Sequence, residues 1–161
     1  MSEAAASQPA TSELPSFNIE KLYVKDLSLE IPHAPGIFLE REQPQIELQL
    51  HTQATNIEDG VFEVSVTVTV TARLSEKNKV MFLIEAKQAG VFQLLNLPPA
   101  EQDTVLAVVC PNIIYPYLRE VVSDVAVRAG FSPVLLNPIN FEALYQQQKQ
   151  QQVEVAPVTT H

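Results

Sequence analysis

The chain has 161 residues, of which 46% are hydrophobic and 18% charged, a balance typical of one globular domain with a real core. Its 19 acidic and 10 basic residues give a net charge of −9, which disfavours nucleic-acid binding, because phosphate contacts need clustered lysines and arginines. A single cysteine, Cys110, excludes an internal disulfide and fits a reducing compartment.

Both ends of the chain are predicted to be disordered tails. Residues 1–16 are rich in Ala, Ser, Thr and Pro and lack the basic and apolar regions of a secretory signal. Residues 153–161 have a similar tail-like composition, which leaves 17–152 as the folded domain. No stretch approaches the roughly 20 apolar residues of a membrane-spanning helix, so we expect a soluble, cytoplasmic protein.

Four strands are predicted in the first half of the chain. Apolar and polar residues alternate in each of them, most clearly from Phe62 to Thr71, so each strand has one buried and one solvated face. The turn signals Glu58-Asp59-Gly60 and 75–79 join the last three strands as hairpins, which indicates an antiparallel sheet. The strands are expected at 22–31, 46–54, 62–71 and 80–88.

Two helices are predicted after the strands. An apolar loop at 90–103 leads to a helix at 104–129, which Pro111 and Pro116 are expected to interrupt or redirect and Gly130 to end. Asn140 is a good N-cap for a last helix at 141–152, whose short apolar stripe gives way to a run of glutamines. Strands followed by helices indicate an α+β fold.

The sequence shows no catalytic constellation. Three histidines lie far apart, and only four glycines occur, none of them in a phosphate-binding loop. The apolar surroundings of Cys110 raise the pKa of its thiol and favour a buried residue over a nucleophile. We therefore expect no enzyme activity, cofactor or metal site. An enzyme that uses Cys110 remains as an alternative, and it predicts a reactive thiol of low pKa.

Apolar surface is abundant outside the strands. The segments 91–97 and 113–117 and the stripe formed by Phe141, Leu144 and Tyr145 exceed what one sheet face needs. They can pack on one another within a monomer, or they can form subunit interfaces or a binding groove. A further alternative is a soluble carrier that encloses a lipid or another small apolar ligand.

The solvated face of the predicted sheet carries a second feature. If Phe82 faces the core, alternation places Leu83 and Glu85 together on the opposite face of the strand, so Leu83 lies beside Glu85 on the solvated side. Asp26 and Glu30 lie on the solvated face of the first strand. Together they predict an acidic patch with one apolar residue, suited to a basic and partly apolar partner. The alternative is an ordinary solvated surface.

Four segments, in chain order, carry a resemblance to a known family. They are Tyr23-Val-Lys-Asp-Leu-Ser-Leu-Glu-Ile-Pro32, Phe82-Leu-Ile-Glu85 with Gln88-Ala-Gly-Val-Phe92, Cys110-Pro-Asn-Ile-Ile-Tyr-Pro-Tyr-Leu-Arg-Glu120, and Pro138-Ile-Asn-Phe-Glu-Ala-Leu144. With these segments the chain resembles, over about 17–150, the SecB family of bacterial protein-export chaperones.

The resemblance implies a cytoplasmic homotetramer, a dimer of dimers. Each subunit would have a four-stranded antiparallel sheet, one long helix and a C-terminal helix. Such chaperones hold unfolded preproteins in a translocation-competent state without ATP, and they deliver them to the motor SecA by binding its zinc-containing C-terminal segment. No cofactor, nucleic acid or direct membrane insertion is implied.

The resemblance also implies three sets of functional residues. Its SecA-binding positions fall on Asp26, Glu30, Leu83 and Glu85, the acidic patch described above. The preprotein groove has as candidates Phe38, Leu48, Leu50, Phe92, Leu94 and Tyr145. Positions that influence or form the oligomer interface fall on Phe82, Ile84, Ala86, Gln88, Cys110, Tyr115 and Tyr117.

Two departures from the family pattern stand out. Many relatives carry a tryptophan between the first two strands where this chain has Glu42, which removes one aromatic wall of the expected groove. The glutamine-rich C-terminal end also lacks the acidic character common there.

Overall fold

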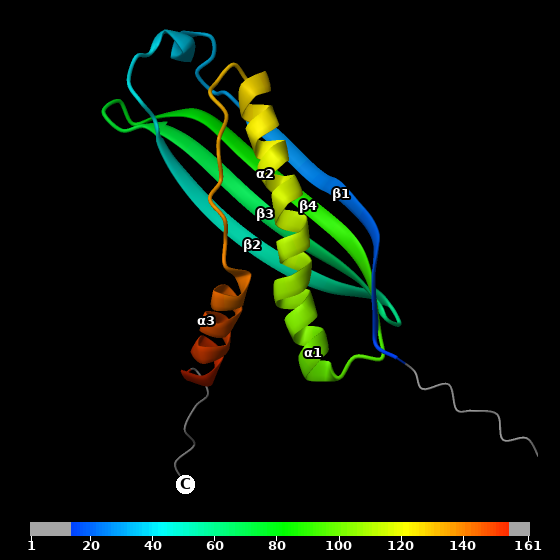
Figure 1. Cartoon of the computed structure of the whole chain (residues 1–161). Helices are drawn as coiled ribbons and strands as arrows, with labels where there is room; N and C mark the ends of the chain where they lie inside the picture. Colours follow the sequence, from blue (N-terminus) through cyan, green and yellow to red (C-terminus); the bar gives the residue numbers. More distant parts are fainter. Residues whose placement is uncertain (1–13, 155–161) are drawn as a thin grey trace, which may run out of the picture.

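The computed structural model describes residues 14–154 of the chain. Tails were predicted at 1–16 and 153–161, and most of each, residues 1–13 and 155–161, lies outside the described residues. Figure 1 shows the sheet and helices, with bounds β1 Ser16–Glu30, β2 Gln45–Glu58, β3 Val61–Leu74, β4 Lys79–Leu95, α1 Pro99–Thr104, α2 Cys110–Arg128 and α3 Phe141–Glu154.

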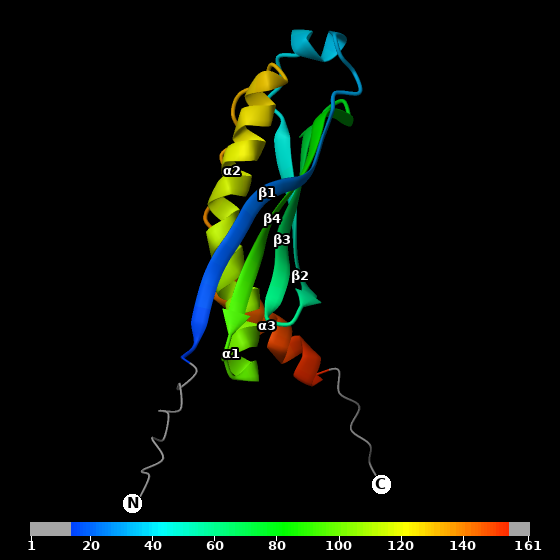
Figure 2. The ribbon, with the colours of Figure 1, turned by 90° about the vertical axis from the view of Figure 1, so that its right-hand side faces the viewer.

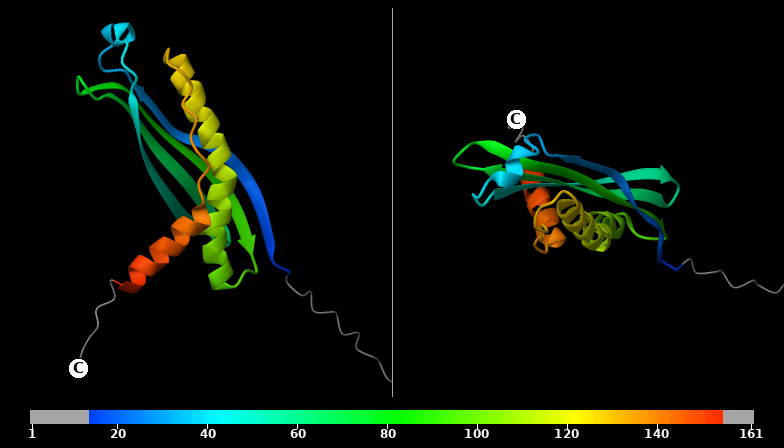
Figure 3. Two further views of the ribbon diagram at one scale, coloured as in Figure 1. Left: turned by 60° about the vertical axis from the view of Figure 1, so that its left-hand side comes forward. Right: turned by 90° about the horizontal axis from the view of Figure 1, so that it is seen from above.

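The four strands form one antiparallel sheet in the order β1-β4-β3-β2. The last three strands are joined by hairpins, as predicted, whereas β1 is connected to β2 by residues 31–44 and lies on the far edge of the sheet (Figure 2). The long helix lies across one face of the sheet and packs on β3 and β4, and the other face is uncovered (Figure 3). These observations confirm the α+β prediction.

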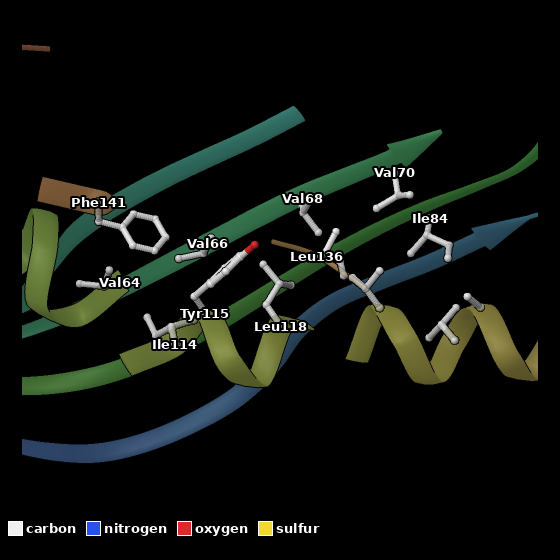
Figure 4. Packing of buried hydrophobic residues seen from close by; sticks show 14 of the residues in the cluster. Val64, Val66, Val68, Val70, Ile84, Ile114, Tyr115, Leu118, Leu136 and Phe141 are labelled. Atoms are coloured by element: carbon white, nitrogen blue, oxygen red, sulfur yellow. The ribbon is translucent and has the colours of Figure 1, made fainter. Parts of the chain in front are cut away.

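The core lies between the sheet and α2. The inward side chains of β3 alternate with polar ones, because successive residues of a strand point to opposite faces. On α2, apolar residues recur at helical spacing and form a buried stripe that meets them (Figure 4). The largest fully buried side chains on these elements are Val64, Val66, Val70, Leu74, Ile84, Phe92, Ile114, Leu118 and Val122.

The expected apolar loop is partly a strand. β4 continues through Gly90 to Leu95, where it pairs with both β1 and β3, so residues 91–95 belong to the sheet. Gly90 is needed there for space, since a Cβ atom would lie 2.7 Å from the Phe92 ring. The prediction was wrong because pairing with two neighbouring strands overrides a local turn signal.

The first helical region is continuous from Pro99 to Arg128 and includes a π-helical turn at Val105–Val109. Proline lacks an N–H and its ring clashes with the carbonyl four residues earlier, and the wider π turn directly precedes Pro111. Pro116 lies inside α2 without ending it. The predicted interruption was therefore wrong.

This helical region is also long and apolar enough to cross a membrane by length and composition, contrary to our expectation that no stretch approaches this limit. However, its buried stripe packs on β3 and β4, which is the arrangement of an amphipathic core helix.

Residues 131–140 join α2 to α3 and are called the crossover segment below. The predicted helix boundaries at both ends of this segment are confirmed. Gly130 adopts a φ of 91°, and the Phe131 N–H donates to the Ala126 carbonyl at 3.0 Å, so the helix ends there. The Asn140 side chain accepts a hydrogen bond from the Ala143 N–H at 3.0 Å and caps α3. The last helix extends to Glu154, two residues into the predicted tail.

Candidate binding surfaces

The uncovered face of the sheet brings the four predicted acidic-patch residues together. Glu30 on β1 lies directly opposite Leu83 on β4, and Glu85 lies opposite Ser28, between Asp26 and Glu30. Cross-strand partners share a face, so all four side chains are on the side away from α2. The three carboxylates are exposed, and Leu83 is partly exposed beside them.

The register adds residues that sequence reasoning missed. Lys87 lies opposite Asp26, and Thr69 and Thr71 of β3 lie opposite Glu85 and Leu83. The patch is therefore bordered by hydroxyl groups and by one basic side chain. No sequence signal links these positions, because the pairing of strands is not local.

A hydrogen-bonded cluster lies further along the same face. Glu63 of β3 accepts hydrogen bonds from the Lys25 ammonium and the Tyr23 hydroxyl of β1. These two donors lower the pKa of the Glu63 carboxyl, the Lys25 bond most strongly. Burial, together with the bond to Glu63, raises the pKa of the Tyr23 hydroxyl to about 12.

Two cavities open on the opposite face of the sheet, beside α2. The crossover cavity, about 540 Å³, lies between the crossover segment and the beginning of β2. The α3 cavity, about 440 Å³, lies between the middle of β2, α3 and Ala107 of the π turn. Ile46 and Leu48 line the first, and Leu50 and Thr52 line the second, so successive inward residues of β2 connect them.

Three of the predicted groove residues line these cavities. Leu48 lines the crossover cavity, and Leu50 and Tyr145 line the α3 cavity. Phe38 stacks on Phe131 with ring centroids 5.2 Å apart, and Phe131 lines the crossover cavity. Phe38 thus supports the wall from outside.

Phe92 and Leu94 do not fit the groove prediction. Both are buried in the core, and Phe92 stacks on Phe17 of β1. They face inward because β4 continues through them as a strand. Sequence reasoning instead missed much of the crossover segment, whose extended backbone gives no periodic signal; its residues in the crossover cavity are Phe131, Ser132, Pro133, Val134, Leu135, Leu136 and Asn137.

Most of the residues expected at the oligomer interface are buried within the single subunit. Tyr117 is exposed on α2, whereas Tyr115 and Cys110 point into the core. The remaining four lie beneath α2 on the inward face of β4, so any influence on assembly would act through the packing of that helix; they are Phe82, Ile84, Ala86 and Gln88.

β1 exposes a different apolar strip. Leu27 and Leu29 lie on its inward side, opposite Ala86 and Ile84, yet both are substantially exposed because α2 packs on β3 and β4. Ile19 and Val24 extend the strip along the same edge strand. This edge combines apolar side chains with unpaired backbone groups.

Cys110 has no features of a nucleophile. Burial raises the pKa of its thiol to about 12, which contradicts the alternative of a reactive cysteine. In the described part of the chain, residues 14–154, no group of three or more His, Cys, Asp or Glu side chains is placed to hold a metal ion.

Comparison with known proteins gives a consistent picture. The family described as preprotein translocase subunit SecB matches residues 10–152. A protein-export protein SecB from Methylobacillus flagellatus is 56% identical over 99% of this chain and 98% of its own length. Another from Nitrosomonas eutropha is 64% identical over 85% of this chain and 86% of its own length.

The solved structure of a SecB-like chaperone from Mycobacterium tuberculosis, in complex with an antitoxin peptide, shares the fold. Its TM-score is 0.62 at 16% identity, over 76% of this chain and 90% of that one. The sequence matches extend over nearly the whole chain, and the fold agrees with them. This chain belongs to the SecB family of cytoplasmic protein-export chaperones, which are not enzymes.

Proposed function

We propose that this export chaperone holds unfolded preproteins along β2 and passes them to SecA through the opposite face of the sheet. The observation that carries the proposal is the pair of partly apolar cavities connected by consecutive inward residues of β2. The acidic patch lies on the other face. A client and the motor can therefore be bound at the same time.

The client surface combines two kinds of weak contact. Apolar side chains of a client enter the cavities, where Leu48 and Leu135 are exposed to receive them. β2 is an edge strand of the sheet, so its outer backbone groups can pair with an extended client. Many such contacts along one chain give avidity with little sequence preference, and no nucleotide is needed.

The motor surface is the acidic patch. Its carboxylates attract a basic segment, and Leu83 adds an apolar contact at the centre. The zinc-containing C-terminal segment of SecA is the partner that the family resemblance implies for these four residues. The attraction between the carboxylates and a basic segment speeds their association, and salt weakens this attraction by screening the charges.

The assembly we propose is a homotetramer, a dimer of dimers. The exposed apolar strip of β1 on an edge strand is the surface that most needs covering. Tyr117 on the outer side of α2 is a second candidate contact.

The carrier alternative predicts an enclosed cavity. Here the cavity walls include exposed side chains such as Leu48 and Leu135, so the observations favour the groove. A search for co-purified lipid tests this alternative directly.

The substitution Glu85→Lys tests the motor surface. It reverses one charge at the centre of the patch, and we expect the affinity for the SecA C-terminal segment to fall about tenfold or more, as for loss of a close charge pair. Calorimetry measures that affinity, and native mass spectrometry with an unfolded preprotein measures assembly and client binding, which should both persist.

Glu47→Lys is the matched control. Glu47 is exposed on the same face but on β2, two strands away from β4, so its reversal makes the same change in net charge outside the patch. Unchanged SecA affinity in Glu85→Lys would refute the motor assignment. A wild-type protein that ignores the unfolded preprotein would refute the client assignment.

A further inference from the structure

We propose that Tyr115 is a positioning residue of the client groove, which sets the spacing between the crossover cavity and the α3 cavity. The inference rests on the proposed role of both cavities in client binding. It also gives Tyr115 a role within the subunit that differs from the interface role implied by resemblance.

The Tyr115 hydroxyl holds the crossover segment. It donates a hydrogen bond of 2.6 Å to the backbone carbonyl of Asn137, a residue that lines the crossover cavity. Tyr115 is only 6% exposed, so little water can reach its hydroxyl and replace this hydrogen bond. Burial raises the pKa of the hydroxyl above its usual value.

The Tyr115 ring holds the other cavity. It meets the ring of Phe141 edge-on, with centroids 5.6 Å apart and planes at 76°. Phe141 is the first residue of α3 and lines the α3 cavity. In Figure 4 the Tyr115 side chain rises from α2 between Phe141 and Leu136. One side chain of the long helix thus contacts a wall residue of each cavity.

The crossover segment has few other polar anchors. Backbone hydrogen bonds hold its two ends, from Phe131 to Ala126 and from Leu144 to Asn140. Between these ends, within the described residues 14–154, the hydrogen bond to Tyr115 is the one that ties the segment to the rest of the protein. Leu136 adds a buried apolar anchor beside it.

The spacing matters only to a client that uses both cavities. Ile46 and Leu48 line the first cavity and Leu50 and Thr52 the second, so corresponding positions on β2 are four residues apart, or about 13 Å at the usual rise of a strand. An extended client therefore needs about five residues to place one side chain in each cavity. If the crossover segment and α3 shift relative to each other, two anchors no longer fit together, while one anchor still fits alone.

The test compares Tyr115→Phe with wild type, using two synthetic peptides of about twelve residues, long enough to span this distance. One peptide carries two Leu anchors about four residues apart in a Ser/Gly background, and the other has one anchor replaced by Ser. Tyr115→Phe keeps the ring and its contact with Phe141 but removes the donor. Tyr23→Phe is the matched control, since it removes a hydroxyl that donates a hydrogen bond to Glu63 on the opposite face of the sheet, away from both cavities.

We expect Tyr115→Phe to bind the two-anchor peptide about threefold to tenfold more weakly, as for loss of one hydrogen bond. Binding of the one-anchor peptide should change by less than about twofold. Hydrogen exchange should become faster in 131–140 and stay unchanged in the buried part of α2. Tyr23→Phe should bind both peptides as wild type does and leave hydrogen exchange in 131–140 unchanged.

The role of Tyr115 would be overturned if the binding of both peptides weakened equally, because a general loss of stability affects one-anchor and two-anchor binding alike. It would also be overturned if neither peptide bound more weakly. The wild-type protein provides the separate check on the proposed groove. If it does not prefer the two-anchor peptide, the cavities do not act together, and the groove assignment itself fails along with the inference built on it.

Discussion

Single charged residues on the open face act through the neighbours that the sheet provides. Glu63 is held by Lys25 and Tyr23, both from β1, although β4 lies between the two strands. Side chains of this length can bridge an intervening strand when its own residue is small, and Ala89, opposite Tyr23, is such a residue. The cluster therefore ties the edge strand to the centre of the sheet.

The pH dependence of stability tests this cluster. Because the folded-state pKa of Glu63 is lowered, its stabilisation is present above the unfolded-state pKa and is lost as the pH falls through the folded-state value. We expect Glu63→Gln to lower the unfolding free energy by roughly 1 kcal/mol at pH 7. The difference from wild type should vanish at low pH.

Urea unfolding followed by circular dichroism, at pH 7 and at pH values below 4, measures both quantities. A difference that grows on acidification would contradict the assignment. Glu47→Gln on the neighbouring strand is the control, since Glu47 is exposed and contacts Arg73 only at 3.7 Å.

At the scale of elements, sequence signals were most reliable where the cause is local. Gly130 and Asn140 act on backbone groups within a few residues, and both behave as predicted. The prolines of the long helix were misjudged because tertiary packing supports a helix that propensity alone would interrupt. The π turn before Pro111 is the local adjustment that makes this possible.

The cap of α3 offers a second prediction. Asn140→Ala removes the acceptor for the Ala143 N–H and should lower the unfolding free energy by about 1 kcal/mol. Asn112→Ala is the control, because Asn112 is exposed inside α2, where alanine is the better helix former. Denaturant midpoints at equal slope measure the two effects.

If Asn140→Ala and Asn112→Ala shifted the midpoint equally, the cap would have no special role. The first turn of α3 carries Phe141, which lines the α3 cavity, so fraying there should also speed hydrogen exchange around this cavity.

The whole molecule separates three surfaces in space. The cavities lie beside α2, the acidic patch lies on the opposite face, and the apolar strip lies along the edge strand β1. The cavities and the strip share the face on which α2 lies but are at opposite edges of the sheet, at β2 and β1, and only the patch lies on the other face. The proposed surfaces for a client, a motor and a second copy therefore do not overlap.

The apolar strip on β1 gives a prediction for the assembly. We expect native mass spectrometry to show a tetramer for the wild type. Leu27→Glu places a charge within the strip and should shift the protein to smaller species, because burying an unpaired carboxylate costs several kcal/mol. Leu39→Glu is the matched control, since Leu39 is exposed in the connection between β1 and β2.

If the tetramer persisted in Leu27→Glu, the assignment of the interface to β1 would be wrong. A monomeric wild type would contradict the proposed tetramer itself. Client binding measured on the same samples shows whether one subunit is sufficient for the groove.

By itself, the sequence determined the faces of the strands, the ends of the helices at Gly130 and Asn140, the membership of the acidic patch and the family. These depend on side-chain period, on backbone groups a few residues apart, or on whole motifs. Only the tertiary structure decided that Lys87 lies opposite Asp26, that Phe92 is buried and that Tyr115 joins two cavity walls. Each of these is a contact between distant residues, and strand register and helix packing, which no local pattern encodes, bring them together.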